Sequence, residues 1–118
     1  MIGKGIASAA PTFTVSIWHN TCPLALMRGW HPRDPMQRVF SYPIPAEQAR
    51  DPHAVLEEAF EAFNVGEGEL AAAYRALGNR SLSVGDIVVI GEVAFACAPI
   101  GWERPRGSIT IAALSAQP

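Results

Sequence analysis

The sequence has few cysteines, few charges and no long hydrophobic run. Only 2 of its 118 residues are cysteine, and no apolar run approaches the ~18 residues that span a bilayer. Residues 1–11 contain one lysine and no continuous apolar stretch, so they do not resemble a secretory signal peptide. We therefore expect a cytoplasmic protein with no membrane partner, in which Cys22 and Cys97 are reduced thiols.

The few charges are distributed unevenly. Charged residues make up 17% of the chain and the formal net charge is −2, which gives no overall indication of nucleic-acid binding. Residues 1–50 carry five basic and two acidic groups, whereas residues 51–70 carry six acidic groups and no lysine or arginine. We interpret this acidic block as the solvent-exposed face of a helix.

The common catalytic and cofactor-binding motifs are also missing. The chain has no glycine-rich phosphate loop, no G-x-S-x-G sequence and no H-E-x-x-H sequence. His19, Cys22 and His31 are of metal-ligand types, but their spacing matches no zinc pattern. The sequence therefore predicts no cofactor, no metal site and no catalytic residue, and we expect a protein that is not an enzyme.

The sequence does contain the signals of one α+β domain over residues 1–118. About half of the residues are apolar, as a compact globule of this length requires. Apolar and polar side chains alternate over residues 12–18, which predicts a half-buried strand. A second strand is expected over Gln37–Tyr42, where two following prolines stop it or confine it to a sheet edge. A last strand is expected over Ser108–Ala113.

Two helices are predicted in the middle of the chain. Asp51-Pro52 suits the start of the first helix, because aspartate caps free N–H groups and proline tolerates the first helical position. The apolar stripe of this helix consists of Leu56, Ala59, Phe60 and Phe63. A second helix is expected from about Gly68 to Leu77, followed by Gly78 in a left-handed conformation. Its apolar stripe consists of Leu70, Ala73, Tyr74 and Leu77.

A hairpin is the strongest local prediction. Within Ile87–Ala98, two apolar runs flank Gly91-Glu92, a pair suited to a type II′ turn. A two-residue turn pairs Ile90 with Val93 and Val88 with Phe95, and both faces of the hairpin are apolar, so it should be central and covered on both sides. We predict an α+β fold in which an antiparallel sheet of four or five strands carries two helices on one side.

The long loop His19–Asp34 is the candidate working surface. Loops that a rigid sheet positions often carry function, and long loops in compact domains are usually functional or disordered. This loop concentrates arginine with tryptophan, side chains that are enriched at binding hot spots. Its candidate binding residues are Arg28, Trp30, His31 and Arg33. In the competing interpretation, Trp30 packs beneath the loop and holds it.

One further stretch carries a resemblance. Residues 80–90 read Arg-Ser-Leu-Ser-Val-Gly-Asp-Ile-Val-Val-Ile, and Val93–Cys97 and Gly101-Trp102 follow. Over about residues 74–102, this pattern resembles the YodL-like domain family of small proteins from bacterial phages, plasmids and conjugative elements. The resemblance implies binding to host machinery or defence systems and brings no catalytic residues. Whether Ser81–Asp86 is structural or a contact surface stays open.

We therefore expect a non-enzymatic protein-binding accessory protein of a phage, plasmid or integrated mobile element, with a host protein as its partner. Two alternatives stay open. One is a small enzyme or metal-binding protein that uses Cys22, His19 and His31. The other is a nucleic-acid-binding module that uses the loop arginines at 28, 33 and 38. The two loops that contain Arg28 with Arg33 and Arg104 with Arg106 carry only four arginines, which are too few to argue for it. The sequence predicts neither the partner's identity nor the oligomeric state.

Overall fold

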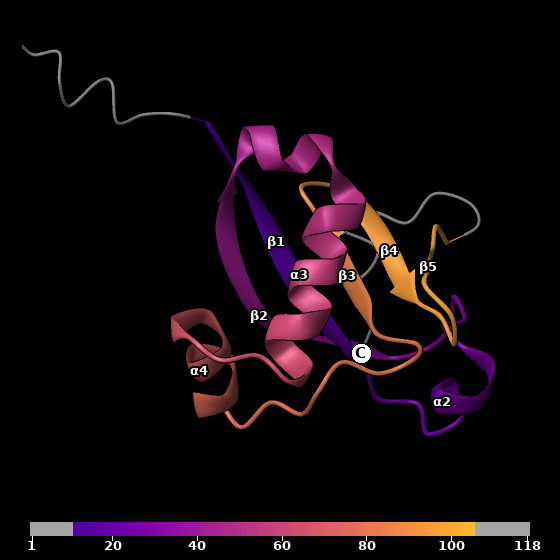
Figure 1. The fold of residues 1–118 in the computed structure, drawn as a ribbon. Helices are drawn as coiled ribbons and strands as arrows, with labels where there is room; N and C mark the ends of the chain where they lie inside the picture. The colour runs from indigo at the N-terminus through magenta and orange to yellow at the C-terminus, as the bar shows by residue number, and fades with distance from the viewer. Residues whose placement is uncertain (1–10, 106–118) are drawn as a thin grey trace, which may run out of the picture.

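Five antiparallel strands form one sheet in the computed structural model, which describes residues 11–105 (Figure 1). The spatial order is β2-β1-β3-β4-β5, so β1 and β3, which are far apart in sequence, are neighbours at the centre. The strands are β1 (Thr12–Asn20), β2 (Met36–Pro45), β3 (Ile87–Ile90), β4 (Val93–Cys97) and β5 (Trp102–Glu103). The strand predicted over Ser108–Ala113 lies outside the described residues.

The longer helices lie on one side of this sheet. Figure 1 shows α3 (Pro52–Asn64) across one face of the sheet and α4 (Glu69–Ala76) below it, toward β2. A short helix, α2 (Ala25–Arg28), lies within the loop between β1 and β2, and a 3-10 helix (Ala46–Arg50) precedes α3. The predicted α+β class, with an antiparallel sheet and two helices packed on one side, is confirmed.

The predicted hairpin has the predicted register. Ile90 pairs with Val93 and Val88 pairs with Phe95. Gly91 has a φ of 66°, and no non-glycine residue among the described ones has a positive φ, as a type II′ turn requires. Because β3 also pairs with β1, its four residues are all buried.

Each face of the sheet has its own apolar cluster. The cluster beneath the helices joins the sheet residues Val15, Ile17 and Val88 to α3 and α4, with Phe63 stacked on Tyr74 at 4.3 Å between ring centroids. The cluster on the opposite face is smaller and consists of Trp18, Met36, Ile87, Val89, Ala94 and Ala96, with Trp30 packed against it. The hairpin is therefore covered on both sides, as predicted.

The second strand is longer than predicted. β2 continues through both prolines to Pro45, because it is an edge strand and the missing N–H groups remove no hydrogen bond that the sheet needs. The prediction that the prolines confine this strand to an edge is confirmed.

The predicted stripes of the two helices are partly wrong. Asp51 caps α3 by accepting a hydrogen bond from Ala54 N–H, as predicted. Phe60, however, is 42% exposed, because α3 presents Val55, Leu56, Ala59 and Phe63 to the sheet. In α4 the buried side chains are Ala71 and Tyr74, whereas Ala73 and Leu77 are exposed. A helix of only eight residues presents too little surface to bury the whole stripe.

Candidate functional site

A fully buried carboxylate organises the end of the sheet where β1 stops. Asp86 directly precedes β3 and accepts hydrogen bonds from the backbone N–H groups of Asn20 (2.8 Å) and Ser83 (2.7 Å). The two terminal nitrogens of Arg80 donate to its two oxygens, at 2.8 and 2.9 Å. A buried carboxylate is tolerated only where it is paired and hydrogen-bonded in this way.

A second carboxylate organises the adjoining loop in the same manner. Asp34 is buried and accepts two hydrogen bonds from Arg28, at 2.8 and 3.0 Å, and one from the His31 N–H. Burial acts to raise the pKa of Asp34, but hydrogen bonds from Arg28, the Asn20 side chain and the His31 N–H lower it to about 2. This carboxylate is therefore ionised at neutral pH.

Asn20 joins the two carboxylates into one polar network. Its side-chain NH₂ donates to Asp34 (2.8 Å) and to the carbonyl of Gly85 (3.0 Å), while its backbone N–H donates to Asp86. Its side-chain oxygen accepts from the Cys22 N–H. We call Asn20, Arg28, Asp34, Arg80 and Asp86 the polar network. Because it spans residues 20 to 86, it fastens two separate loops to the end of β1.

A buried histidine lies beside this network. Tyr74 O–H donates to the carbonyl of Arg80 at 2.7 Å, so the 2.7 Å contact between Tyr74 Oη and His19 Nε2 requires a proton on that nitrogen. Burial lowers the pKa of His19, and nearby Arg80 adds to this effect, while Asp86 opposes it. Burial also raises the pKa of Tyr74 to about 12, with a further contribution from Asp86. At neutral pH His19 is therefore a neutral imidazole with its hydrogen on Nε2.

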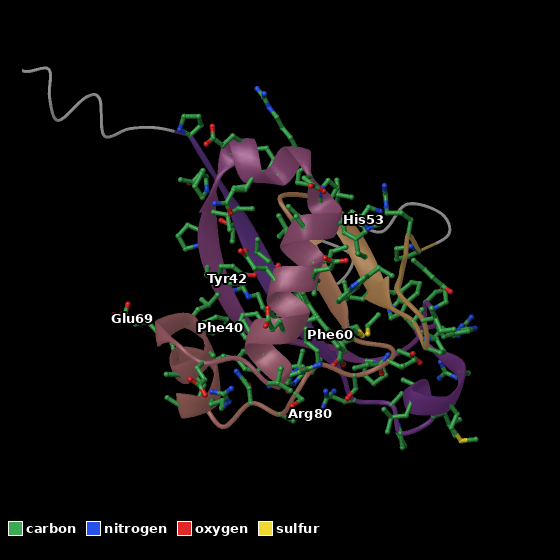
Figure 2. The ribbon with its side chains drawn as sticks, viewed as in Figure 1. Phe40, Tyr42, His53, Phe60, Glu69 and Arg80 are labelled. Atoms are coloured by element: carbon green, nitrogen blue, oxygen red, sulfur yellow. The ribbon has the colours of Figure 1, made fainter. Side chains whose placement is uncertain are left out.

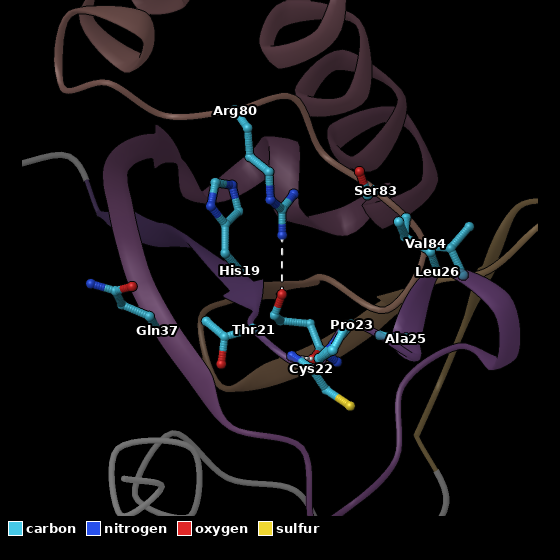
Figure 3. A pocket seen from close by; sticks show the side chains of 11 residues that line it. His19, Thr21, Cys22, Pro23, Ala25, Leu26, Gln37, Arg80, Ser83 and Val84 are labelled. Carbon is cyan, nitrogen blue, oxygen red and sulfur yellow. Dashed lines mark hydrogen bonds between the residues drawn. The ribbon is translucent and has the colours of Figure 1, made fainter.

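These elements surround a pocket of about 450 Å³ at the end of β1, which we call the β1-end pocket (Figure 3). The loop after β1 forms one wall and residues 80–84 form the other. Its polar lining comprises His19, Asn20, Thr21, Cys22, Gln37, Arg80 and Ser83. Its apolar lining comprises Pro23, Ala25, Leu26 and Val84. The mixture suits a side chain or small molecule with both apolar and neutral polar groups.

Both arginines of the polar network, of which Arg80 lines this pocket, are already paired within the protein. Both terminal nitrogens of Arg80 donate to Asp86, and they also donate to the carbonyls of Ser81 and Asn20. Arg28 is used similarly, because its terminal nitrogens donate to Asp34, to the Gly29 carbonyl and to Cys22 Sγ. These contacts leave the terminal nitrogens of both guanidiniums little free capacity for an external phosphate.

Cys22 is paired with this network rather than with a histidine. Its Sγ accepts from Arg28 at 3.2 Å, and no hydrogen bond among residues 11–105 links it to His19 or His31. Within the same range, no group of three or more metal-ligand side chains comes together. Cys22 and Cys97 are both free thiols. The thiol–imidazole pair that the enzyme alternative requires is therefore not formed in this structure.

The four residues proposed from the sequence lie in one loop but do different things. Arg28 and His31 meet at Asp34, where Arg28 donates through its side chain and His31 through its backbone N–H. Trp30 is half-buried against the smaller apolar cluster, on the sheet face opposite the helices. Arg33 is exposed, and its N–H donates to His31 Nδ1 at 3.4 Å. Among the four, Arg33 extends freely to the surface, whereas Arg28 and Trp30 hold the loop.

Sequence reasoning missed the most exposed apolar residues of this loop. Leu24, Leu26 and Met27 are 59%, 64% and 84% exposed, and they lie on and beside α2. We call these three residues the α2 knob. The sequence signal that would have identified it is the apolar run after Pro23, within a loop otherwise rich in proline and charge.

Comparisons with protein-family models, with characterised proteins and with solved structures find no match to this chain. The resemblance of residues 74–102 to the YodL-like family therefore stays a prediction. Among the described residues, no helix is both long and apolar enough to cross a membrane.

Proposed function

We propose that this chain is a non-enzymatic protein-binding accessory protein of a phage, plasmid or integrated mobile element, with a host protein as its partner. The observation that carries the binding role is the α2 knob. Its three large apolar side chains, at positions 24, 26 and 27, are more than half exposed, and Leu26 also lines the β1-end pocket. Single exposed apolar residues are ordinary, but three such residues within four positions of a braced loop suit a protein interface.

The polar network supports this role because it braces both walls of the pocket. Arg28 and Asp34 close the loop that carries the knob, and Arg80 and Asp86 hold the opposite wall. Asn20 joins the two pairs. A surface that is rigid before binding loses less conformational entropy when a partner docks. We infer that a partner packs on the knob and inserts one side chain into the β1-end pocket, which Leu26 lines.

The same contacts favour protein binding over the two alternatives. A nucleic-acid site needs several arginines whose donors are free for phosphates. Of the three arginines of that alternative, Arg28 is paired with Asp34 and Arg38 lies over the ring of Trp18, which leaves only the exposed Arg33. A thiol enzyme needs a base beside Cys22, whose sulfur is paired with Arg28 instead. The assignment to a mobile element rests on the resemblance carried by residues 80–90.

The test starts from a partner and ends at the knob. The protein is immobilised, exposed to nuclease-treated bacterial lysate, and the stoichiometric partner is purified and its affinity measured. Leu26→Glu and Met27→Glu should each weaken binding by ~10-fold or more, because they place a charge in an apolar contact. Leu77→Glu is the matched control, since Leu77 is 66% exposed at the end of α4. Equal affinities of all three variants for the partner would contradict the proposal.

A further inference from the structure

A second hollow lies away from the β1-end pocket, between α3 and the chain that joins β4 to β5. Its volume is about 380 Å³. Its lining combines aromatic and small residues with two carboxylates: Glu57, Phe60, Glu61, Cys97, Ala98, Pro99, Gly101 and Trp102. Figure 2 shows Phe60 beside α3, on the side toward β4 and β5. We call this hollow the α3–β5 groove.

The groove leaves large apolar surface in contact with solvent. Phe60 is 42% exposed, and its ring meets the ring of Trp102 edge to face at 6.3 Å between centroids. Ile100, between two of the lining residues, is 93% exposed. Phe60 does not belong to the buried apolar cluster on either face of the sheet. Core packing therefore does not explain an aromatic residue at this position. Its exposed ring is available to an incoming apolar side chain.

The charge around the groove has one sign on the helix side. Glu57 and Glu61 lie one turn apart on α3 and both line the groove. They belong to residues 51–70, which contain six acidic groups and no lysine or arginine. Neither carboxylate takes part in an ion pair within residues 11–105. The nearby Arg104 does not line the groove and lies over the ring of Phe95, at 5.5 Å from its centroid.

We propose that the α3–β5 groove binds a segment of a partner protein in which a large apolar side chain is flanked by lysine or arginine. The apolar side chain covers Phe60 and Trp102, and the flanking cations meet Glu57 and Glu61. Charge complementarity selects this occupant, because an acidic or neutral segment would leave two carboxylates facing it unpaired. The exposed ring of Phe60 also attracts cations through its face. This site is separate from the α2 knob and does not depend on it.

The experiment titrates the ¹⁵N-labelled full chain with two synthetic peptides of equal length and identical apolar residues, one with four lysines and one with four glutamates. The readout is the indole N–H resonance of Trp102, assigned with Trp102→Phe. The lysine peptide should shift this resonance more than those of Trp18 and Trp30. Its affinity should fall by about 3-fold or more between about 50 and about 300 mM salt, because exposed charges are screened.

Two matched pairs of substitutions decide whether the groove carboxylates are responsible. The double substitution Glu57→Gln with Glu61→Gln should lower the affinity for the lysine peptide by about 5-fold or more. Glu67→Gln with Glu69→Gln changes the net charge equally, at exposed positions that do not line the groove, and should weaken it by less than about 2-fold. Leu26→Glu should leave peptide binding unchanged, which separates this site from the proposed function.

Several outcomes would overturn the inference. The first is no shift of the Trp102 resonance at about 1 mM lysine peptide, which would mean a Kd weaker than about 1 mM. The second is an equal response to the glutamate peptide. The third is that both pairs of substitutions weaken binding of the lysine peptide equally. A shift of Trp102 with protein concentration alone would show that a second copy of the chain, and not a basic partner segment, occupies the groove.

Discussion

Asp86→Asn tests whether the polar network holds the two loops together. Asp86 is fully buried and accepts from two backbone N–H groups and both terminal nitrogens of Arg80. Asparagine keeps one accepting oxygen and places an NH₂ group against a donor, so at least one buried donor loses its partner, at about 1–3 kcal/mol. The lost attraction to Arg80 adds less than a fully buried pair would, because Arg80 is 45% exposed. We expect a total loss of about 3 kcal/mol.

The assay is urea unfolding together with the thermal midpoint. About 3 kcal/mol is a large part of the ~5–15 kcal/mol that stabilises a small domain, and should lower Tm by about 10 °C. Asp51→Asn is the control, since asparagine caps a helix as well as aspartate, and it should cost less than about 0.5 kcal/mol. Adding Arg80→Gln to Asp86→Asn should cost less than the sum of the single changes. A loss below about 1 kcal/mol for Asp86→Asn would refute the reasoning.

Three further predictions concern the same region. The folded pKa of Asp34 is lowered from 3.8 to about 2, so its contribution to stability is present above pH 3.8 and is lost as the pH falls toward 2; Asp34→Asn should remove this part of the acid unfolding curve. Gly85→Ala should cost about 2 kcal/mol or more in urea unfolding, because φ is +97° and a Cβ would lie 2.6 Å from a side chain of α2, whereas Gly78→Ala meets no atom within 4 Å and should cost less. Burial raises the pKa of Cys97 to about 11, so iodoacetamide at neutral pH should label the half-exposed Cys22 first, as mass spectrometry will show; equal labelling would contradict the buried placement of Cys97.

Local signals in the sequence predicted the parts of the fold that local physics decides. The hairpin register follows from two apolar runs and one turn, all within Ile87–Ala98, and the structure has that register. The start of α3 follows from Asp51 and Pro52, which are adjacent. In both cases the interacting residues lie within about a dozen positions of one another, so one sequence window contains the whole interaction.

The polar network was beyond such reasoning, because its contacts join distant residues. The hydrogen bond between Asn20 and Asp86 joins residues that are 66 positions apart. Nothing in the sequence indicates that this asparagine and this aspartate are partners. For the same reason Arg28 and Arg33 were indistinguishable in the sequence, although the fold pairs the first with a buried carboxylate and leaves the second exposed. Helical spacing likewise predicted that Phe60 is buried, and this was wrong. The spacing gives the face of the helix, but it does not show how far the sheet extends beneath α3.

The position of Gly85 and Asp86 answers in part whether Ser81–Asp86 is structural or a contact surface. A side chain at 85 would collide with α2, and the carboxylate at 86 is consumed by Arg80 and two backbone N–H groups. These two positions therefore brace the loop that carries the α2 knob and present nothing to a partner. Ser83 differs, because it lines the β1-end pocket. We therefore expect Ser83→Ala to lower the affinity for the partner but to leave Tm within about 2 °C, since it removes one partly exposed hydroxyl. Asp86→Asn, in contrast, should lower both the affinity and Tm. Unchanged affinity of Ser83→Ala for the purified partner would show that the pocket is not part of the interface, which would then consist of the α2 knob without it.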